Sequence, residues 1–140
     1  MNPSVLLDTG FIVALLDRSE RRHGECVRAI QGLGAALVTC EAVVAEACYL
    51  LRGVPGAPAA VLANVGNGTF QVPFNLSTQA DDVARLMERY ADIPMDLADA
   101  CLVRLAELHD SPRILTLDAD FHVYRWKQRR VFDLLLDPRI

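Results

Sequence analysis

Short apolar runs alternate with helical stretches along the chain, and this alternation is the feature that most limits its possible folds. The runs typical of strands are residues 4–7, 35–39, 69–74, 113–117 and 131–136. Helical spacing of apolar residues predicts helices over 11–17, about 20–33, 40–51, 59–65, 77 or 78 to 93, and 96–109. Because parallel strands need crossover connections, the order predicts an α/β fold with a parallel sheet and helices on both faces. Thr9 and Thr39 are expected to cap two of the helices.

The composition is that of one domain with its own core. The chain has 140 residues, of which 52% are hydrophobic and 23% charged, and a chain of this length buries about two-thirds of its unfolded surface. Its uncharged apolar stretches fall short of the roughly 20 residues that a membrane helix needs. The N-terminus lacks the basic and apolar regions of a secretory signal. We therefore expect a cytoplasmic protein that does not associate with membranes.

The 4 cysteines, Cys26, Cys40, Cys48 and Cys101, have no C-x-x-C spacing and lie within apolar patterns. Such a distribution favours buried thiols over a zinc site or a disulfide framework.

Three acidic residues lie at positions where a charged side chain suggests a functional role. Asp8 directly follows the first predicted strand, and Asp118 ends a later one. Ligand sites in open parallel sheets lie outside the carboxyl ends of the strands, so both carboxylates should face the same crevice. Glu46 lies in the middle of an apolar helix, where a covered charge is costly unless it is paired or bound to a metal; taken alone, it is as consistent with a solvent-facing position.

Three further acids fall near these positions. Asp96 and Asp99 share a face in the first turn of a predicted helix, where the helix dipole favours anions, and Asp120 follows Asp118. Taken singly, Asp96 and Asp99 are typical of helix caps and Asp120 of a turn.

The combined pattern predicts a site for a hard divalent cation. Carboxylate oxygens without accompanying His or Cys suit Mg²⁺ or Mn²⁺ and not zinc. Without a cation, clustered carboxylates repel one another and their pKa values rise. The net charge of -4 argues at first sight against a nucleic-acid partner, but a bound cation offsets the acids locally. Such ions activate water for attack on a phosphodiester, which is the substrate class that the pattern indicates.

Four segments, in order, resemble the four acidic motifs of PIN-domain ribonucleases: Val5–Asp17, Val44–Ala47, Asp96–Ala100 and Leu115–Phe121. The resemblance covers essentially the whole chain, and the small size is most similar to VapC-type toxins of bacterial toxin–antitoxin pairs. It implies a single PIN-like nuclease domain over residues 1–140, a three-layer α/β/α sandwich around a parallel sheet. It also implies cleavage of RNA with Mg²⁺ or Mn²⁺, inhibition by a small cognate antitoxin, and a homodimer.

The resemblance assigns roles residue by residue. Asp8, Glu46, Asp99 and Asp118 match the catalytic, metal-binding acids, and Asp96 and Asp120 match auxiliary metal-binding acids. Thr116 is similar to the hydroxyl before the last acid and Thr9 to the small polar residue after the first, while Gly10 departs from the usual Ser or Asn. Substrate contacts are expected from Thr9, Thr116, Arg125, Lys127 and Arg129. Arg130, Tyr124 and Trp126 belong to the same basic and aromatic cluster, and Trp126 is also consistent with a core position. A second basic cluster comprises Arg18, Arg21, Arg22 and His23.

Other interpretations compete with this one. The triplet Asp8-Thr9-Gly10 resembles the active-site triplet of aspartic proteases, but those enzymes are nearly all β and would leave the later acids unexplained. Phosphatases of the haloacid-dehalogenase type need a second acid two residues after the first, where this chain has Gly10. An RNA-processing nuclease that is not a toxin, and a non-catalytic binding module, would share the same pattern. Toxicity on expression that disappears with Asp8→Asn distinguishes the toxin from both.

Overall fold

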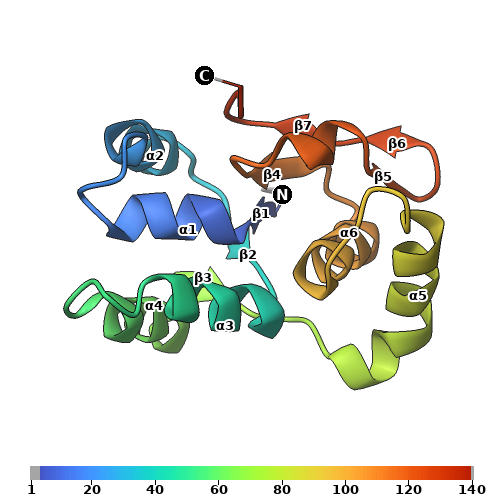
Figure 1. The fold of residues 1–140 in the computed structure, drawn as a ribbon, viewed down its shortest axis with the longest axis horizontal. Helices are drawn as coiled ribbons and strands as arrows, with labels where there is room; N and C mark the ends of the chain where they lie inside the picture. Colours follow the sequence, from blue (N-terminus) through green and yellow to red (C-terminus); the bar gives the residue numbers. More distant parts are fainter. Residues whose placement is uncertain (1–3, 140) are drawn as a thin grey trace.

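A parallel five-stranded sheet forms the centre of the molecule (Figure 1). The computed structural model describes residues 4–139. The strands, β1 (Val5–Leu7), β2 (Leu37–Val38), β3 (Phe70–Gln71), β4 (Arg113–Leu115) and β7 (Asp133–Leu134), are arranged in the order β3-β2-β1-β4-β7. Every neighbouring pair is parallel. The α/β prediction is confirmed, and each of the five predicted runs contains a strand shorter than the run itself.

Six helices cover the sheet: α1 (Thr9–Leu16), α2 (His23–Gln31), α3 (Glu41–Leu50), α4 (Ala57–Gly66), α5 (Leu76–Arg89) and α6 (Leu97–His109). In Figure 1, α1 and α2 lie on one side of β1, and α5 and α6 lie on the other. Helices α3 and α4 pack beside α1, and α4 also contacts β3. The helices therefore form layers on both faces, as the sequence predicts. None of the helices in residues 4–139 is long and apolar enough to cross a bilayer.

The burial of β1 explains its position in the centre of the sheet. Val5, Leu6 and Leu7 are all fully buried, so residues pointing to either face of the strand meet a helical layer. Such continuous apolar strands are typical of parallel sheets covered on both sides. Burial of the whole strand fixes its register in the sheet. The next residue, Asp8, therefore lies at the carboxyl edge of the sheet.

The predicted helix caps were wrong in detail. Asp8 caps α1 by accepting a hydrogen bond from the backbone N–H of Thr9, so Thr9 is the first helical residue. Cys40 occupies the cap position of α3 without a side-chain bond, because the hydroxyl of Thr39 donates instead to the carbonyl of Leu7 at 2.8 Å. The helix predicted to start at residue 77 or 78 begins at Leu76, where Asn75 accepts the capping bond.

The segment after β4 contains structure that the sequence did not predict. A short 3₁₀ helix (Ala119–His122) precedes an antiparallel hairpin of β5 (Arg125–Trp126) and β6 (Arg130–Val131). The chain then returns to the sheet at β7. All four cysteines are free; Cys26, Cys40 and Cys101 are buried, whereas Cys48 is half-buried.

Candidate metal centre

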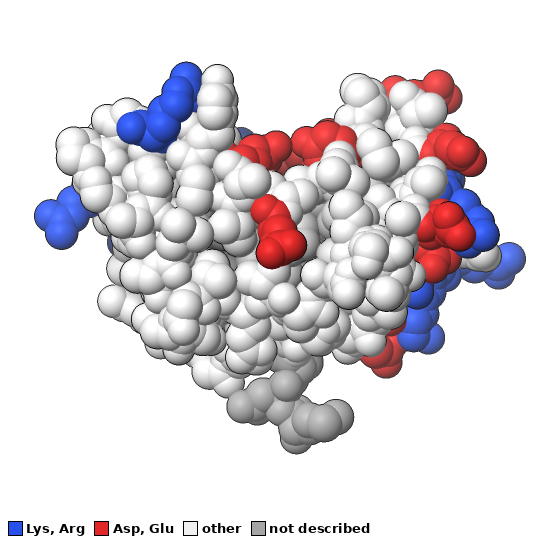
Figure 2. All heavy atoms as spheres, turned by 90° about the horizontal axis from the view of Figure 1, so that it is seen from below, with Lys and Arg blue, Asp and Glu red and all other residues white. Residues whose placement is uncertain are grey.

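A pocket of about 390 Å³ opens at the carboxyl edge of the sheet and is lined largely by acids. The lining residues are Asp8, Thr9, Gly10, Glu46, Leu50, Asp96, Asp99, Leu117, Asp118 and Ala119. They come from the ends of β1 and β4, the first turns of α1 and α6, and the middle and end of α3. Figure 2 shows acidic side chains gathered around a hollow in the upper outline of the molecule. The fold thus brings together five carboxylates from four separate segments.

Asp8 is the most deeply buried of these acids, with 5% of its surface exposed. One carboxylate oxygen accepts the backbone N–H of Thr9 at 2.8 Å, and the other accepts the hydroxyl of Thr116 at 2.6 Å. Burial, with a smaller contribution from the nearby charges of Asp118 and Glu46, raises the pKa of Asp8 to about 6, although these two hydrogen bonds act to lower it. Asp8 is therefore rigidly oriented, and its ionised form is unfavourable unless a cation is near.

Asp99 is held in the first turn of α6 by a buried tyrosine. The hydroxyl of Tyr124 donates to Asp99 Oδ2 at 3.1 Å, and the ring of Tyr124 is fully buried between those of Tyr90 and Phe121. Burial, then repulsion from Asp96 and Asp8, raises the pKa of Asp99 to about 7. Two carboxyls in one pocket with pKa values near neutrality are characteristic of functional sites.

Thr116 connects the first acid to the last. While its hydroxyl donates to Asp8, the same oxygen accepts the backbone N–H of Asp118 at 3.0 Å. Asp118 in turn caps the 3₁₀ helix by accepting the backbone N–H of Asp120 at 2.9 Å. The pKa of Asp118 is raised, first by burial and then by repulsion from Asp120 and Asp96. The end of β4 therefore positions two of the predicted acids through one hydroxyl.

The remaining predicted acids occupy the rim or lie behind it. Glu46 projects from α3 into the pocket and also lines a neighbouring, mainly apolar hollow. Asp96 is exposed and caps α6 by accepting the backbone N–H of Asp99 at 2.8 Å. Asp120 does not line the pocket, although its charge acts on Asp118. The structure therefore gathers Asp8, Glu46, Asp96, Asp99 and Asp118 and places Asp120 outside this group.

The donor set fits a hard cation that keeps part of its water shell. All the charged groups that line the pocket are carboxylates, and Thr9 Oγ1 is the buried side-chain polar atom that lacks a hydrogen-bond partner within residues 4–139. In the same residues, no three His, Cys, Asp or Glu side chains converge closely enough to enclose an ion. Mg²⁺ commonly takes one or two carboxylates and retains several waters, which suits this spacing.

The predicted substrate cluster lies on the β5–β6 hairpin and not in the pocket. Tyr124 and Trp126 are buried, so the expectation that their rings stack on RNA bases was wrong, and Trp126 takes the core position that the sequence also allowed. Arg125 donates from Nη1 to the carbonyls of His122, Val123 and Tyr124, which fixes the turn before β5. The Lys127 ammonium pairs with Asp110, whereas Arg129 is exposed.

In the other basic cluster, Arg22 pairs with Glu25, and His23 Nδ1 contacts the carbonyl of Ala14.

The sequence interpretation gave Tyr124 the wrong role. It placed this residue among the aromatic contacts to RNA, whereas the structure shows it supporting Asp99. Neighbouring cations suggested an exposed position, and only the packing of the hairpin against α6 shows that the ring points inward. No local signal separates these two possibilities.

Comparison with known proteins gives matches over most of the chain. Residues 5–127 match the family model described as the PIN domain. Ribonuclease VapC26 of Mycobacterium tuberculosis is 32% identical over 116 residues, which are 81% of this chain and 86% of that protein. The crystal structure of Mycobacterium tuberculosis VapC20, titled a sarcin-ricin loop cleaving toxin, superposes with a TM-score of 0.80 at 20% identity. The match covers 90% of this chain and 98% of VapC20.

Proposed function

Because the chain belongs to the PIN-domain family and is of the VapC type, we propose that it is a divalent-metal-dependent endoribonuclease, the toxin of a bacterial toxin–antitoxin pair. The observation that carries this proposal is the pocket in which five carboxylates meet at the carboxyl edge of the sheet. The name of the VapC26 relative supports RNA as the substrate. The likeness to VapC20 supports the fold.

Asp8, Asp99 and Asp118 are the residues that would hold Mg²⁺ or Mn²⁺, directly or through water, with Asp96 and Asp120 as outer acids. When bound, the ion supplies a water of lowered pKa and stabilises negative charge on a phosphate under attack. Asp8 and Asp99, whose pKa values are raised by burial and by the neighbouring acids, would release protons when such an ion binds near neutral pH.

Glu46 orients the attacking water in this proposal. It lies on α3 and lines the same pocket as the acids at the strand ends, so its carboxylate would be available to accept a proton from water held there. Thr116 and Tyr124 keep Asp8 and Asp99 in fixed orientations, so that the acids need no reorganisation when substrate arrives. Thr9, whose buried hydroxyl has no hydrogen-bond partner among residues 4–139, completes the pocket wall next to Asp8.

A small antitoxin and a second copy of the chain are the proposed protein partners. Tyr49, Leu50 and Leu62, on α3 and α4, are each more than half exposed. Such exposed apolar side chains beside the mouth of a site are typical of protein-binding surfaces. A protein bound there would reach the rim of the pocket, because Leu50 lines it and Tyr49 lines the adjoining hollow.

The test is cleavage of total RNA by purified, partner-free protein with Mg²⁺ or Mn²⁺, beside an EDTA control. We expect discrete fragments that disappear with EDTA and in Asp8→Asn and Asp99→Asn. The matched control is Asp137→Asn, which changes an acid paired with Arg139 outside the pocket and should leave cleavage unchanged. Absence of cleavage by the wild-type protein, or equal cleavage by the pocket variants, would contradict the proposal.

Expression in a bacterium separates the toxin from an RNA-processing nuclease. A toxin should arrest growth, and Asp8→Asn should abolish the arrest. Cleavage in vitro without growth arrest would favour the RNA-processing role.

A further inference from the structure

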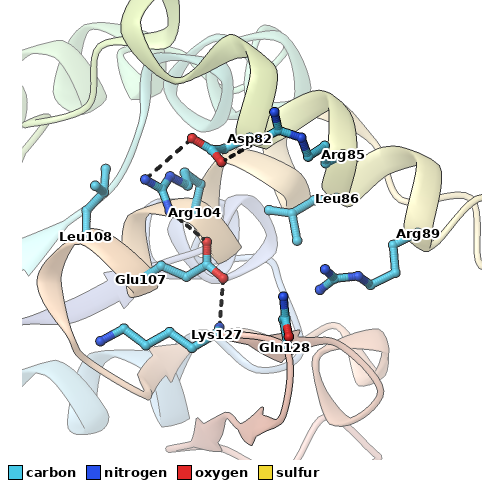
Figure 3. A pocket seen from close by; sticks show the side chains of 9 residues that line it. All are labelled: Asp82, Arg85, Leu86, Arg89, Arg104, Glu107, Leu108, Lys127 and Gln128. Carbon is cyan, nitrogen blue, oxygen red and sulfur yellow. Dashed lines mark hydrogen bonds and ion pairs between the residues drawn. The ribbon is translucent and has the colours of Figure 1, made fainter.

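A second pocket, of about 500 Å³, lies between α5, α6 and the loop of the β5–β6 hairpin (Figure 3). It shares no lining residue with the acidic pocket. Its charged lining residues are four cations, Arg85, Arg89, Arg104 and Lys127, and two carboxylates, Asp82 and Glu107. Positive side chains thus outnumber negative ones in this pocket, whereas every charged side chain in the metal site is negative.

Both carboxylates make contacts that build the pocket. Asp82 forms an ion pair with Arg104 at 3.6 Å and another with Arg85 at 3.1 Å. Glu107 accepts Arg104 Nη1 at 3.0 Å and the backbone N–H of Lys127 at 2.7 Å, which ties the hairpin loop to α6. Arg104 also donates from Nε to Gln79 at 2.7 Å, so its guanidinium is held in place. These acids therefore shape the walls and leave little negative charge free to repel an anion.

The two arginines of α5 are the cations available to a ligand. Arg89 has no hydrogen-bond or ion-pair partner within residues 4–139, and its guanidinium projects across the pocket toward Gln128 (Figure 3). The ion pair of Arg85 with Asp82 joins side chains that are 69% and 44% exposed, and exposed pairs of this kind are weak and easily exchanged. Arg85 and Arg89 are four residues apart on one helix face, where like charges repel unless an anion lies between them.

The hairpin loop adds an unusual backbone conformation at the mouth of the pocket. Lys127 and Gln128 have φ values of 47° and 70°, in the left-handed region that non-glycine residues seldom adopt. This conformation is held by the Glu107 bond and places the Gln128 side chain beside Arg89 (Figure 3). Sparsely populated backbone conformations persist where the surrounding structure enforces them, and they cluster at binding sites.

We propose that this pocket binds backbone phosphates of the RNA substrate outside the scissile position, and so serves as a second anchoring site. Guanidinium groups suit phosphate because they present parallel N–H donors to two oxygens. Helix α6 joins the two pockets, since Asp99 is in its first turn and Arg104 lies five residues on, about 7.5 Å along the axis. The pocket itself indicates a ligand with phosphate groups; that this ligand is RNA rests on the proposed function.

The first test is RNA binding without cleavage. Fluorescence anisotropy with a labelled 20-nucleotide single strand in EDTA compares the wild type with the double variant Arg85→Gln, Arg89→Gln. The control is Arg28→Gln, which removes an exposed arginine of α2 outside the pocket. For the double variant we expect weaker binding and a shallower slope of log affinity against log salt, by about 0.7 for each lost phosphate contact. A slope equal to that of the wild type overturns the proposal.

The second test separates this proposal from the ribonuclease function. With Mg²⁺ or Mn²⁺, the double variant should show a raised KM for long RNA and an unchanged kcat for the shortest oligonucleotide that the wild type cleaves. A wild type that binds RNA through the pocket but cleaves none contradicts the ribonuclease function alone. A wild type that cleaves RNA, together with a double variant that binds and cleaves identically, refutes the anchoring site alone.

Discussion

Replacing Asp99 with Asn should stabilise the metal-free protein. Asp99 is 9% exposed, and burial together with the charges of Asp96 and Asp8 raises its pKa from 3.8 to about 7. The Asn side chain has the same shape, keeps an oxygen that can accept the Tyr124 hydroxyl, and carries no charge. The substitution therefore removes the unfavourable ionisation and preserves the hydrogen bond.

The magnitude follows from the pKa shift. About three pKa units at 1.36 kcal/mol each predict a gain of up to about 4 kcal/mol at pH 8. For a chain of this length, with an unfolding entropy of about 2.1 cal/mol/K per residue, this is a rise in Tm of roughly 14 °C.

The gain should shrink as the pH falls. Since the folded-state pKa lies above the unfolded one, protonation of Asp99 stabilises the wild-type fold; this stabilisation is complete below pH 3.8 and lost as the pH rises through about 7. The advantage of the variant should therefore fall to about 2 kcal/mol at pH 5.

Thermal unfolding followed by circular dichroism in EDTA, at pH 5 and pH 8, measures both effects. Asp137→Asn is the control, because the carboxyl of Asp137 is paired with Arg139 and its pKa is lowered and not raised. A lower Tm for Asp99→Asn than for the wild type at pH 8, or a gain that grows toward acid pH, would refute the reasoning.

Three other substitutions test the hydroxyl groups that line the pocket or bond to its acids, and each is measured by urea unfolding in EDTA. Thr9→Val should change stability by less than about 0.5 kcal/mol, since Thr9 Oγ1 makes no hydrogen bond; a loss above about 1 kcal/mol would reveal a bond there. Thr116→Val should cost about 2 kcal/mol, because it removes the donor to Asp8 and the acceptor of the Asp118 N–H; an unchanged midpoint would contradict this network. Tyr124→Phe keeps the ring packing and should cost about 1 kcal/mol through the lost bond to Asp99, and a neutral result would show that the bond contributes nothing.

The sequence predicted the sheet because each strand lies within a short stretch rich in apolar residues and bounded by turns. Val5, Leu6 and Leu7 are a clear example, since only a strand covered on both faces needs three consecutive buried residues. The β5–β6 hairpin escaped prediction because its strands have two residues each and its loop contains Lys127 and Gln128 at positive φ. Glycine or asparagine usually signals such a conformation, and neither is present.

The acids of the site were predictable because strand ends converge at one edge of a parallel sheet. Asp8 and Asp118 follow directly from this rule, and the structure places both in the pocket. The residues that hold these acids in place were harder to predict, because they act through contacts between positions far apart in the sequence. Tyr124 reaches Asp99 from 25 positions away, and Thr116 reaches Asp8 from 108.

Direct measurement of Mn²⁺ binding tests the central claim, that the acidic pocket is a divalent-metal site. Isothermal titration of metal-free protein should show saturable binding in the wild type and in Asp137→Asn. Binding should be at least about tenfold weaker in Asp8→Asn. A cooperative thermal unfolding transition of this variant serves as the control that it is folded. Saturable binding that is equal in the wild type and Asp8→Asn, or no binding to the wild type, would contradict the claim.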